Sequence, residues 1–223
     1  MVRYCVLPDP GCRHRIYMRA AKYWVFPLAL TLMVLIWSGI GPRDRFTWFL
    51  EVMPVLIALP VLFLTYRSFP LTPLVYGLLA VHGVILMVGG HYTYAEMPLF
   101  NWLRDAFDLS RNHYDRVGHL AQGFIPALLA REILLRRSPL GPGGWLFFLV
   151  TCVCLAFSAF YEMLEWWVAV ASGDEAVAFL ATQGDVWDTQ WDMFLALLGA
   201  LSSQLLLGRW HDRQLARLKE SPP

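Results

Sequence analysis

Apolar residues fall in six long blocks along the chain, and short polar stretches separate them. A helix needs about 20 mostly apolar residues to cross about 30 Å of hydrocarbon. Neither the alternation of a half-buried strand nor the 3.6-residue period of a surface helix accounts for blocks of this length. The pattern predicts an all-α, polytopic transmembrane helical bundle with six spans, at residues 22–40, 46–66, 72–90, 114–135, 145–171 and 189–208.

The predicted bundle has a short tail at each end. We expect a basic tail at 1–21, a six-helix transmembrane domain at 22–208 and a second tail at 209–223. The first span follows the basic tail, as in a signal peptide. Its apolar core is long, however, and no small-x-small cleavage site follows it. We therefore interpret it as a retained anchor.

Basic residues are distributed unevenly between the two sides of the predicted bundle. One side holds only Arg43, Arg45, Arg104, Arg111 and Arg116, and the other side holds all remaining lysines and arginines. Cytoplasmic loops of membrane proteins carry the excess of Lys and Arg. This bias predicts that both termini are cytoplasmic.

The overall composition agrees with a membrane protein. Of the 223 residues, 57% are apolar and 16% are charged, whereas soluble domains carry about 25% charged residues. The net charge of +1 argues against nucleic acid as a partner, because nucleic acid binding needs a basic surface. The expected partner is the lipid bilayer, and the sequence leaves the oligomeric state open.

Ionisable residues gather at one depth of the predicted bundle, toward its outer face. Such residues are costly inside a bilayer, so they usually face the bundle interior and mark a site. The group consists of His91, Tyr94, Glu96, Asp115, Arg116, His119, Glu162, Glu165, Asp185, Asp188 and Asp192.

Helical spacing places many of these residues on shared faces. Asp115, His119 and Gln122 follow i, i+4, i+7, and Glu162 and Glu165 follow i, i+3. The three aspartates would share a third face if the last helix began before Asp185. Three polar stripes at one depth predict a shared pocket.

The residue types suggest roles in this pocket. We expect acid–base chemistry from His119, Glu162, Glu165 and Asp188. Substrate contacts are expected from Arg116, His91, Tyr94 and Asp115, with Arg116 suited to hold a phosphate.

Crowded carboxylates must bind a metal, take up protons or pair with bases. A divalent transition metal is therefore one candidate cofactor, with His119, Glu162, Asp188 and Asp192 as its ligands. A protonated or arginine-paired pocket and a purely structural hydrogen-bond network are the alternatives.

The polar strings inside the apolar chain resemble those of a known family. The segments His91-Tyr-Thr-Tyr-Ala95, Asn112-His-Tyr-Asp-Arg-Val-Gly-His119, Phe160-Tyr-Glu-Met-Leu-Glu-Trp166 and Thr182-Gln-Gly-Asp-Val-Trp-Asp-Thr-Gln-Trp-Asp-Met193 resemble the YjdF-like family of bacterial inner-membrane proteins. This resemblance covers most of residues 25–208. It implies an inner-membrane location and no particular reaction.

A looser similarity links the same positions to VanZ-like membrane proteins. Those proteins have an Asp-Lys-x-x-His at the start of one helix, a Glu late in the next and an Asp with a Gly on the last. The corresponding residues here are Asp115-Arg116-x-x-His119, Glu162 or Glu165, and Asp188 or Asp192 with Gly199. Because Arg116 stands where that pattern has lysine, the similarity does not carry over a shared ligand.

Three functions fit these observations. The first is an enzyme acting on a lipid or lipid-linked substrate at the outer leaflet. The second is a small-molecule or ion-coupled transporter, which would place a site near the midplane. The third is a non-catalytic envelope protein. The polar residue near the midplane is His82, expected to be a neutral histidine bonded to a neighbouring helix, or else a relay or ligand.

Overall fold

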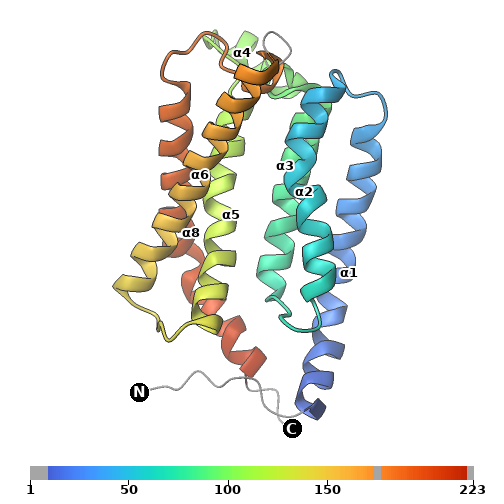
Figure 1. Cartoon of the computed structure of the whole chain (residues 1–223), viewed down its shortest axis with the longest axis vertical. Helices are drawn as coiled ribbons and strands as arrows, with labels where there is room; N and C mark the ends of the chain where they lie inside the picture. The colour runs from blue at the N-terminus through green and yellow to red at the C-terminus, as the bar shows by residue number, and fades with distance from the viewer. Residues whose placement is uncertain (1–9, 173–176, 220–223) are drawn as a thin grey trace.

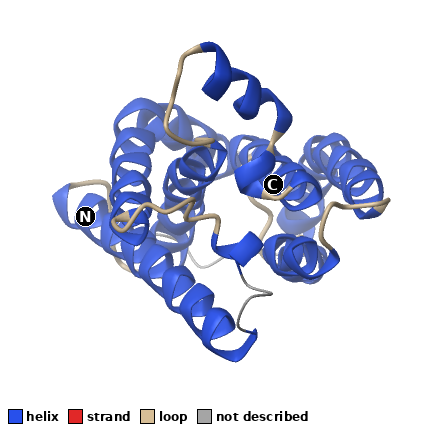
Figure 2. Cartoon of the chain, turned by 90° about the horizontal axis from the view of Figure 1, so that it is seen from above, coloured by secondary structure: helices blue, strands red, loops and turns tan. Residues whose placement is uncertain are grey.

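The computed structural model describes residues 10–172 and 177–219, which form helices and connecting loops with no strand among them (Figure 2). The helices are α1 (Pro10–Gly39), α2 (Arg45–Thr65), α3 (Pro73–Tyr92), the 3₁₀ turn η1 (Tyr94–Glu96), α4 (Pro98–Ala106), α5 (Tyr114–Arg137), α6 (Gly144–Ser172), the single turn α7 (Val177–Leu180) and α8 (Asp188–Lys219). The predicted all-α class is confirmed.

The long helices form two groups of three (Figure 1). In one group α1 and α2 both pack against α3, and in the other α5, α6 and α8 pack against one another. Contacts between α3 and α5 join the groups. As a result α5 has neighbours on several sides and occupies the centre of the bundle.

Four of the described helices are long and apolar enough to cross a membrane, namely α2, α3, α6 and α8. The apolar part of α1, Trp24–Gly39, is shorter. Helix α5 misses this criterion because it carries ionisable residues near both ends. Several of these residues, including Asp115, His119, Arg131 and Glu132, are buried. Neighbouring helices therefore cover the polar side chains of α5.

Two helices extend further than the predicted spans. Helix α1 begins at Pro10, inside the predicted tail, and α8 continues to Lys219. The condition for a shared face of the three aspartates, a helix start before Asp185, is not met, because α8 begins at Asp188. The Asp185 side chain instead accepts a hydrogen bond from the Trp187 N–H at 3.0 Å. Such an Asx turn competes with helical geometry and leaves Asp185 in the approach to the helix.

The backbones of α5 and α8 approach each other closely where these helices cross. An added Cβ at Gly123 would lie 1.8 Å from the backbone oxygen of Ala196, and one at Gly199 would lie 2.2 Å from the backbone oxygen of Leu120. Both positions therefore require glycine for the backbones to approach, as is common between membrane helices. The contact between Gly123 and Ala196 lies one helical turn below His119 and Asp192, so it sets the separation of these two side chains.

Candidate functional site

His119 on α5 lies at the centre of a cluster of carboxylates at the end of the bundle where α4 is found. Its Nε2 is 3.4 Å from the Asp115 carboxylate on its own helix and 3.9 Å from the Asp192 carboxylate on α8. Its Nδ1 is 3.8 Å from the Glu162 carboxylate on α6. All four residues are buried. We call Asp115, His119, Glu162, Glu165 and Asp192 the His119 cluster.

Two subsets of the His119 cluster have the arrangement of metal ligands. The first consists of Asp115, His119 and Asp192, and the second of His119, Glu162 and Glu165. In each subset one ligand atom per residue lies within 4.8 Å of the others. Imidazole with carboxylates suits Zn, Mn or Fe.

The hydrogen bond at His119 favours the first subset. Nδ1 lies 3.0 Å from the Gln122 side-chain oxygen, which can only accept a hydrogen bond. Nδ1 then carries a proton, and the lone pair of a neutral ring is on Nε2, facing Asp115 and Asp192. Metal-binding histidines commonly donate their other N–H in this way.

Two carboxylate oxygens of the cluster have no hydrogen-bond partner among the residues that the structure describes. They are Oε1 of Glu162 and Oδ1 of Asp192, both buried. A buried carboxylate oxygen without a partner is costly, because the protein provides nothing that replaces its hydration. These atoms are therefore suited to accept a cation or a substrate proton.

Arg111 is a buried cation that the sequence analysis did not assign to the site. Its guanidinium pairs with Asp188, lies 3.5 Å from Asp115 and donates to the Ala181 carbonyl at 3.2 Å. Only 5% of the Arg111 side chain is exposed. The sequence analysis expected Asp188 to be a metal ligand. In the structure Asp188 pairs with Arg111, and the two subsets with the arrangement of metal ligands contain Asp115 and Glu165 but not Asp188. The sequence alone does not show the pairing of Arg111 with Asp188, because Arg111 lies in the polar loop before α5.

Arg116 also has partners within the protein. Its guanidinium donates to Asp185 at 2.6 Å and lies 5.1 Å from the centre of the Trp191 ring. Asn112 and Gln183 exchange two hydrogen bonds of 2.9 Å beside these pairs. The segment before α8 is thus fixed to the start of α5. Arg116 remains a candidate for phosphate contact only if a substrate displaces Asp185.

Tyr94 and His91 lie on the α3 side of this end. The buried Tyr94 ring fits a gap left by Gly89 and Gly118, where an added Cβ would lie 2.2 and 2.9 Å from the ring. Burial raises the pKa of Tyr94 well above its usual range, so the phenol keeps its proton. His91 instead bonds the Ser38 carbonyl at 3.0 Å and contacts the Trp37 ring, on α1.

Glu51 on α2 is a further buried acid that the sequence analysis did not single out. It accepts a 3.4 Å hydrogen bond from Tyr161, whose ring packs edge-on against His119 at 6.4 Å. Glu51 thus connects α2 to the His119 cluster through one aromatic side chain. A carboxylate inside a predicted span is itself an unusual feature, and that feature could have identified it.

Sequence comparison agrees with the membrane architecture. A family model described as "Predicted membrane protein (DUF2238)" matches residues 23–213. The chain belongs to this family. The inner membrane protein YjdF of Escherichia coli (strain K12) is 53% identical over 190 residues, which cover 85% of this chain and 91% of that protein. No solved structure matches the chain.

These matches confirm the resemblance to YjdF-like proteins and the location in the bacterial inner membrane. The similarity to VanZ-like proteins stays a prediction. The DUF2238 match extends from α1 to the last turns of α8, so it includes the whole His119 cluster.

A second buried polar group of this DUF2238 protein lies at the opposite end of α5. Glu132 accepts hydrogen bonds from the Thr72 hydroxyl at 2.8 Å, from Arg136 at 2.5 Å and from His211 at 3.1 Å. Arg131 donates to the other nitrogen of His211 and to Asp212. Because every member has a partner, this group has the features of a structural network that joins α3, α5 and α8.

Proposed function

We propose that this chain is an inner-membrane enzyme that acts on a lipid or lipid-linked substrate with the help of a divalent transition metal ion. The observation that carries this proposal is the convergence of Asp115, Glu162 and Asp192 on His119 from three helices. Two of these carboxylates, Glu162 and Asp192, each have an oxygen without a hydrogen-bond partner among the described residues, and a cation could use these acceptor atoms.

Charge supports a cation at this place. The His119 cluster contains four carboxyl groups and one imidazole. Arg116 pairs with Asp185, and Arg111 is shared between Asp188 and Asp115. The described residues provide no arginine partner for Glu162, Glu165 or Asp192. Carboxylates this close must share a cation or protons. We assign Asp115, His119 and Asp192 as the metal ligands, with Gln122 orienting the histidine. Glu162 and Glu165 then provide acid–base groups beside the ion.

The depth of the cluster supports a lipid substrate. Trp187 is exposed just before α8, and Trp191 and Phe194 are exposed on its first turns, close to Asp192 in the sequence. Tryptophan is enriched at the level of the lipid headgroups. A site beside these side chains would meet headgroups, and the predicted orientation would place it at the outer leaflet.

The metal can be tested on purified protein in mild detergent. After incubation with Mn²⁺ or Zn²⁺ and removal of free ions, we expect one bound ion per chain by elemental analysis. His119→Gln and Asp192→Asn should lose the ion because each removes a ligand. Asp105→Asn, an exposed acid paired with Arg104, is the matched control and should retain it. Equal metal content in all four proteins would contradict the proposal.

The substrate can be tested in cells. Lipid extracts from a strain that carries only His119→Gln should accumulate a lipid species that is absent when the parent protein is present. Identical lipid profiles for the parent and the variant would argue for the transporter or the non-catalytic envelope protein.

A further inference from the structure

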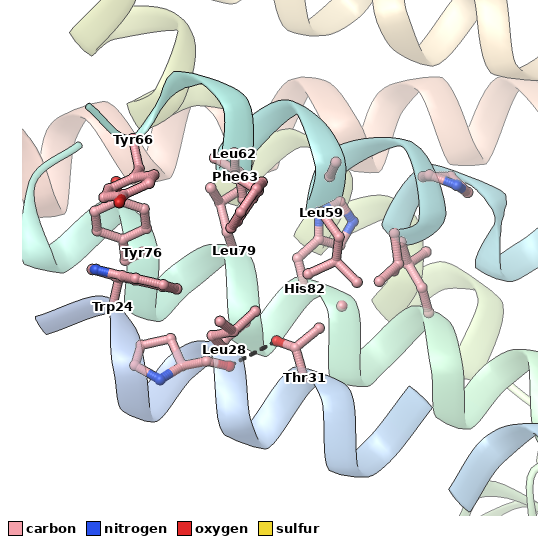
Figure 3. A pocket seen from close by; sticks show the side chains of 17 residues that line it. Trp24, Leu28, Thr31, Leu59, Leu62, Phe63, Tyr66, Tyr76, Leu79 and His82 are labelled. Atoms are coloured by element: carbon pink, nitrogen blue, oxygen red, sulfur yellow. Dashed lines mark hydrogen bonds between the residues drawn. The ribbon is translucent and has the colours of Figure 1, made fainter. Parts of the chain in front are cut away.

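Two hollows in the described part of the chain differ in their chemistry. One is an apolar cavity of about 200 Å³ between α1, α2 and α3, where Trp24, Tyr66 and Tyr76 gather toward one end and His82 lies further along α3 (Figure 3). The expected bond of His82 to a neighbouring helix is not seen at Nε2, which has no hydrogen-bond partner among the described residues. The wall is otherwise almost entirely hydrocarbon, so it does not define an occupant.

The second hollow opens on the surface of the first turns of α8 and has a cation beside it. It is lined by Trp187, Gln190, Trp191 and Phe194. The guanidinium of Arg116 lies 5.1 Å from the centre of the Trp191 ring. An apolar surface with tryptophan at headgroup level and a basic side chain at its edge suits a lipid with an anionic headgroup.

Two guanidinium groups converge on the Asp185 carboxylate beside this hollow. Arg116 donates to its Oδ2 at 2.6 Å, and a nitrogen of Arg111 lies 3.6 Å from the same oxygen. The side chains of Arg116 and Asp185 are 20% and 25% exposed, so a ligand can reach this pair from outside the bundle. Arginines in such an arrangement suit a phosphate, whose oxygens can accept from both guanidiniums at once.

The charges at this place require a phosphate to replace Asp185. Arg111 also pairs with Asp188 and lies 3.5 Å from Asp115, so among the described residues two cations already face three carboxylates. A phosphate added to this set would be repelled, because like charges at close range are unfavourable. The partly exposed Asp185 side chain can turn toward solvent while its segment stays hydrogen-bonded to the start of α5.

We propose that Arg116 and Arg111 bind the phosphate of a lipid headgroup, and that Asp185 occupies this position until the lipid displaces it. The hydrocarbon chain of the lipid lies in the hollow beside Trp191. A neutral lipid brings no charge that can replace Asp185, so the arginines select a phosphorylated one. This inference rests on the proposed function, because it names the group by which the enzyme recognises its lipid substrate.

Asp185→Asn tests the displacement directly. The amide keeps the oxygen that accepts from the Trp187 N–H, whereas an NH₂ group replaces the oxygen that accepts from Arg116. We expect Asp185→Asn to bind dioctanoyl phosphatidic acid about two- to fivefold more tightly than the parent does, measured by calorimetry in an uncharged detergent. A gain of affinity cannot arise from misfolding. Arg116→Gln should weaken binding about tenfold, because it removes a charge-assisted hydrogen bond.

The exposed pair of Arg104 and Asp105 on α4, at the same end of the bundle, provides matched controls. Arg104→Gln and Asp105→Asn should bind the phosphatidic acid like the parent. Dioctanoylglycerol lacks the phosphate and inorganic phosphate lacks the chains, so the parent should bind both more weakly. Binding of either compound as tight as that of the phosphatidic acid would overturn the proposal. Unchanged affinity of Arg116→Gln or weaker binding by Asp185→Asn would also overturn it.

Metal content separates this inference from the proposed function. Arg116 is not one of the proposed metal ligands, so Arg116→Gln should hold as much metal as the parent. A parent protein that binds the metal but shows no preference for the phosphatidic acid would contradict the phosphate site alone. A parent protein that shows this preference without binding the metal would contradict the metal site alone.

Discussion

Glu132 and Glu162 are both buried carboxylates, yet their surroundings are opposite. Glu132 is fully buried and contacts Thr72, Arg136 and His211, so each of its oxygens has a partner. Glu162 is 8% exposed, and its Oε1 has no hydrogen-bond partner in the described part of the chain. The contrast is consistent with a structural role for Glu132 and with the acid–base role that we propose for Glu162.

This contrast predicts opposite effects on stability. Glu132→Ala leaves buried partners unmatched and should destabilise the protein by about 3–5 kcal/mol. Glu162→Gln removes a charge from a crowded cluster and should be neutral or stabilising. Thermal melting of each purified variant beside the parent measures both effects. If Glu162→Gln lost as much stability as Glu132→Ala, the His119 cluster would be scaffolding.

Helix α5 shows how one element can carry two different sites. Its first turns contribute Asp115 and His119 to the cluster, and its last turns contribute Arg131 and Glu132 to the structural network. Such a helix is too polar to face lipid along its whole length, and α3, α6 and α8 cover it. The crossing at Gly123 then fixes the distance from α5 to α8.

We expect Gly123→Ala to separate α5 from α8, because the new methyl group would overlap the backbone of Ala196. Overpacking of this kind costs about 1–3 kcal/mol, and Asp192 should move away from His119. Both the melting temperature and the bound metal should therefore decrease. Gly208→Ala is the matched control on α8, since nothing lies within 4 Å of its added Cβ. Unchanged metal content in Gly123→Ala would refute the role of this crossing.

For the whole molecule, the first and last helices bear on topology. The start of α1 and the end of α8 lie at the same end of the bundle, opposite α4 (Figure 1). An even number of crossings produces this arrangement. We therefore propose six spans, with α1 and α5 added to the four strongly apolar helices and with both ends in the cytoplasm.

Reporter fusions test this topology. Fusions after Arg137 and after Arg217 should report the cytoplasm, because the basic residues gather on that side. A fusion near Asp108, in the loop after α4, should report the periplasm. A periplasmic signal from the fusion after Arg217 would exclude an even number of spans and the outer position of the His119 cluster.

The sequence by itself determined the helical class and the membrane location, and it identified the residues of the His119 cluster as candidates. Long apolar blocks and polar residues at helical spacing are local signals, so His119, Glu162 and Asp192 could be found without coordinates. The pairing of Asp188 with Arg111 depended on tertiary structure, because a loop residue has no periodicity that shows where its side chain lies. The same holds for the close approach at Gly123 and for the cavity beside His82. These features arise from how helices distant in sequence pack together, and the order of residues along one helix does not encode that geometry.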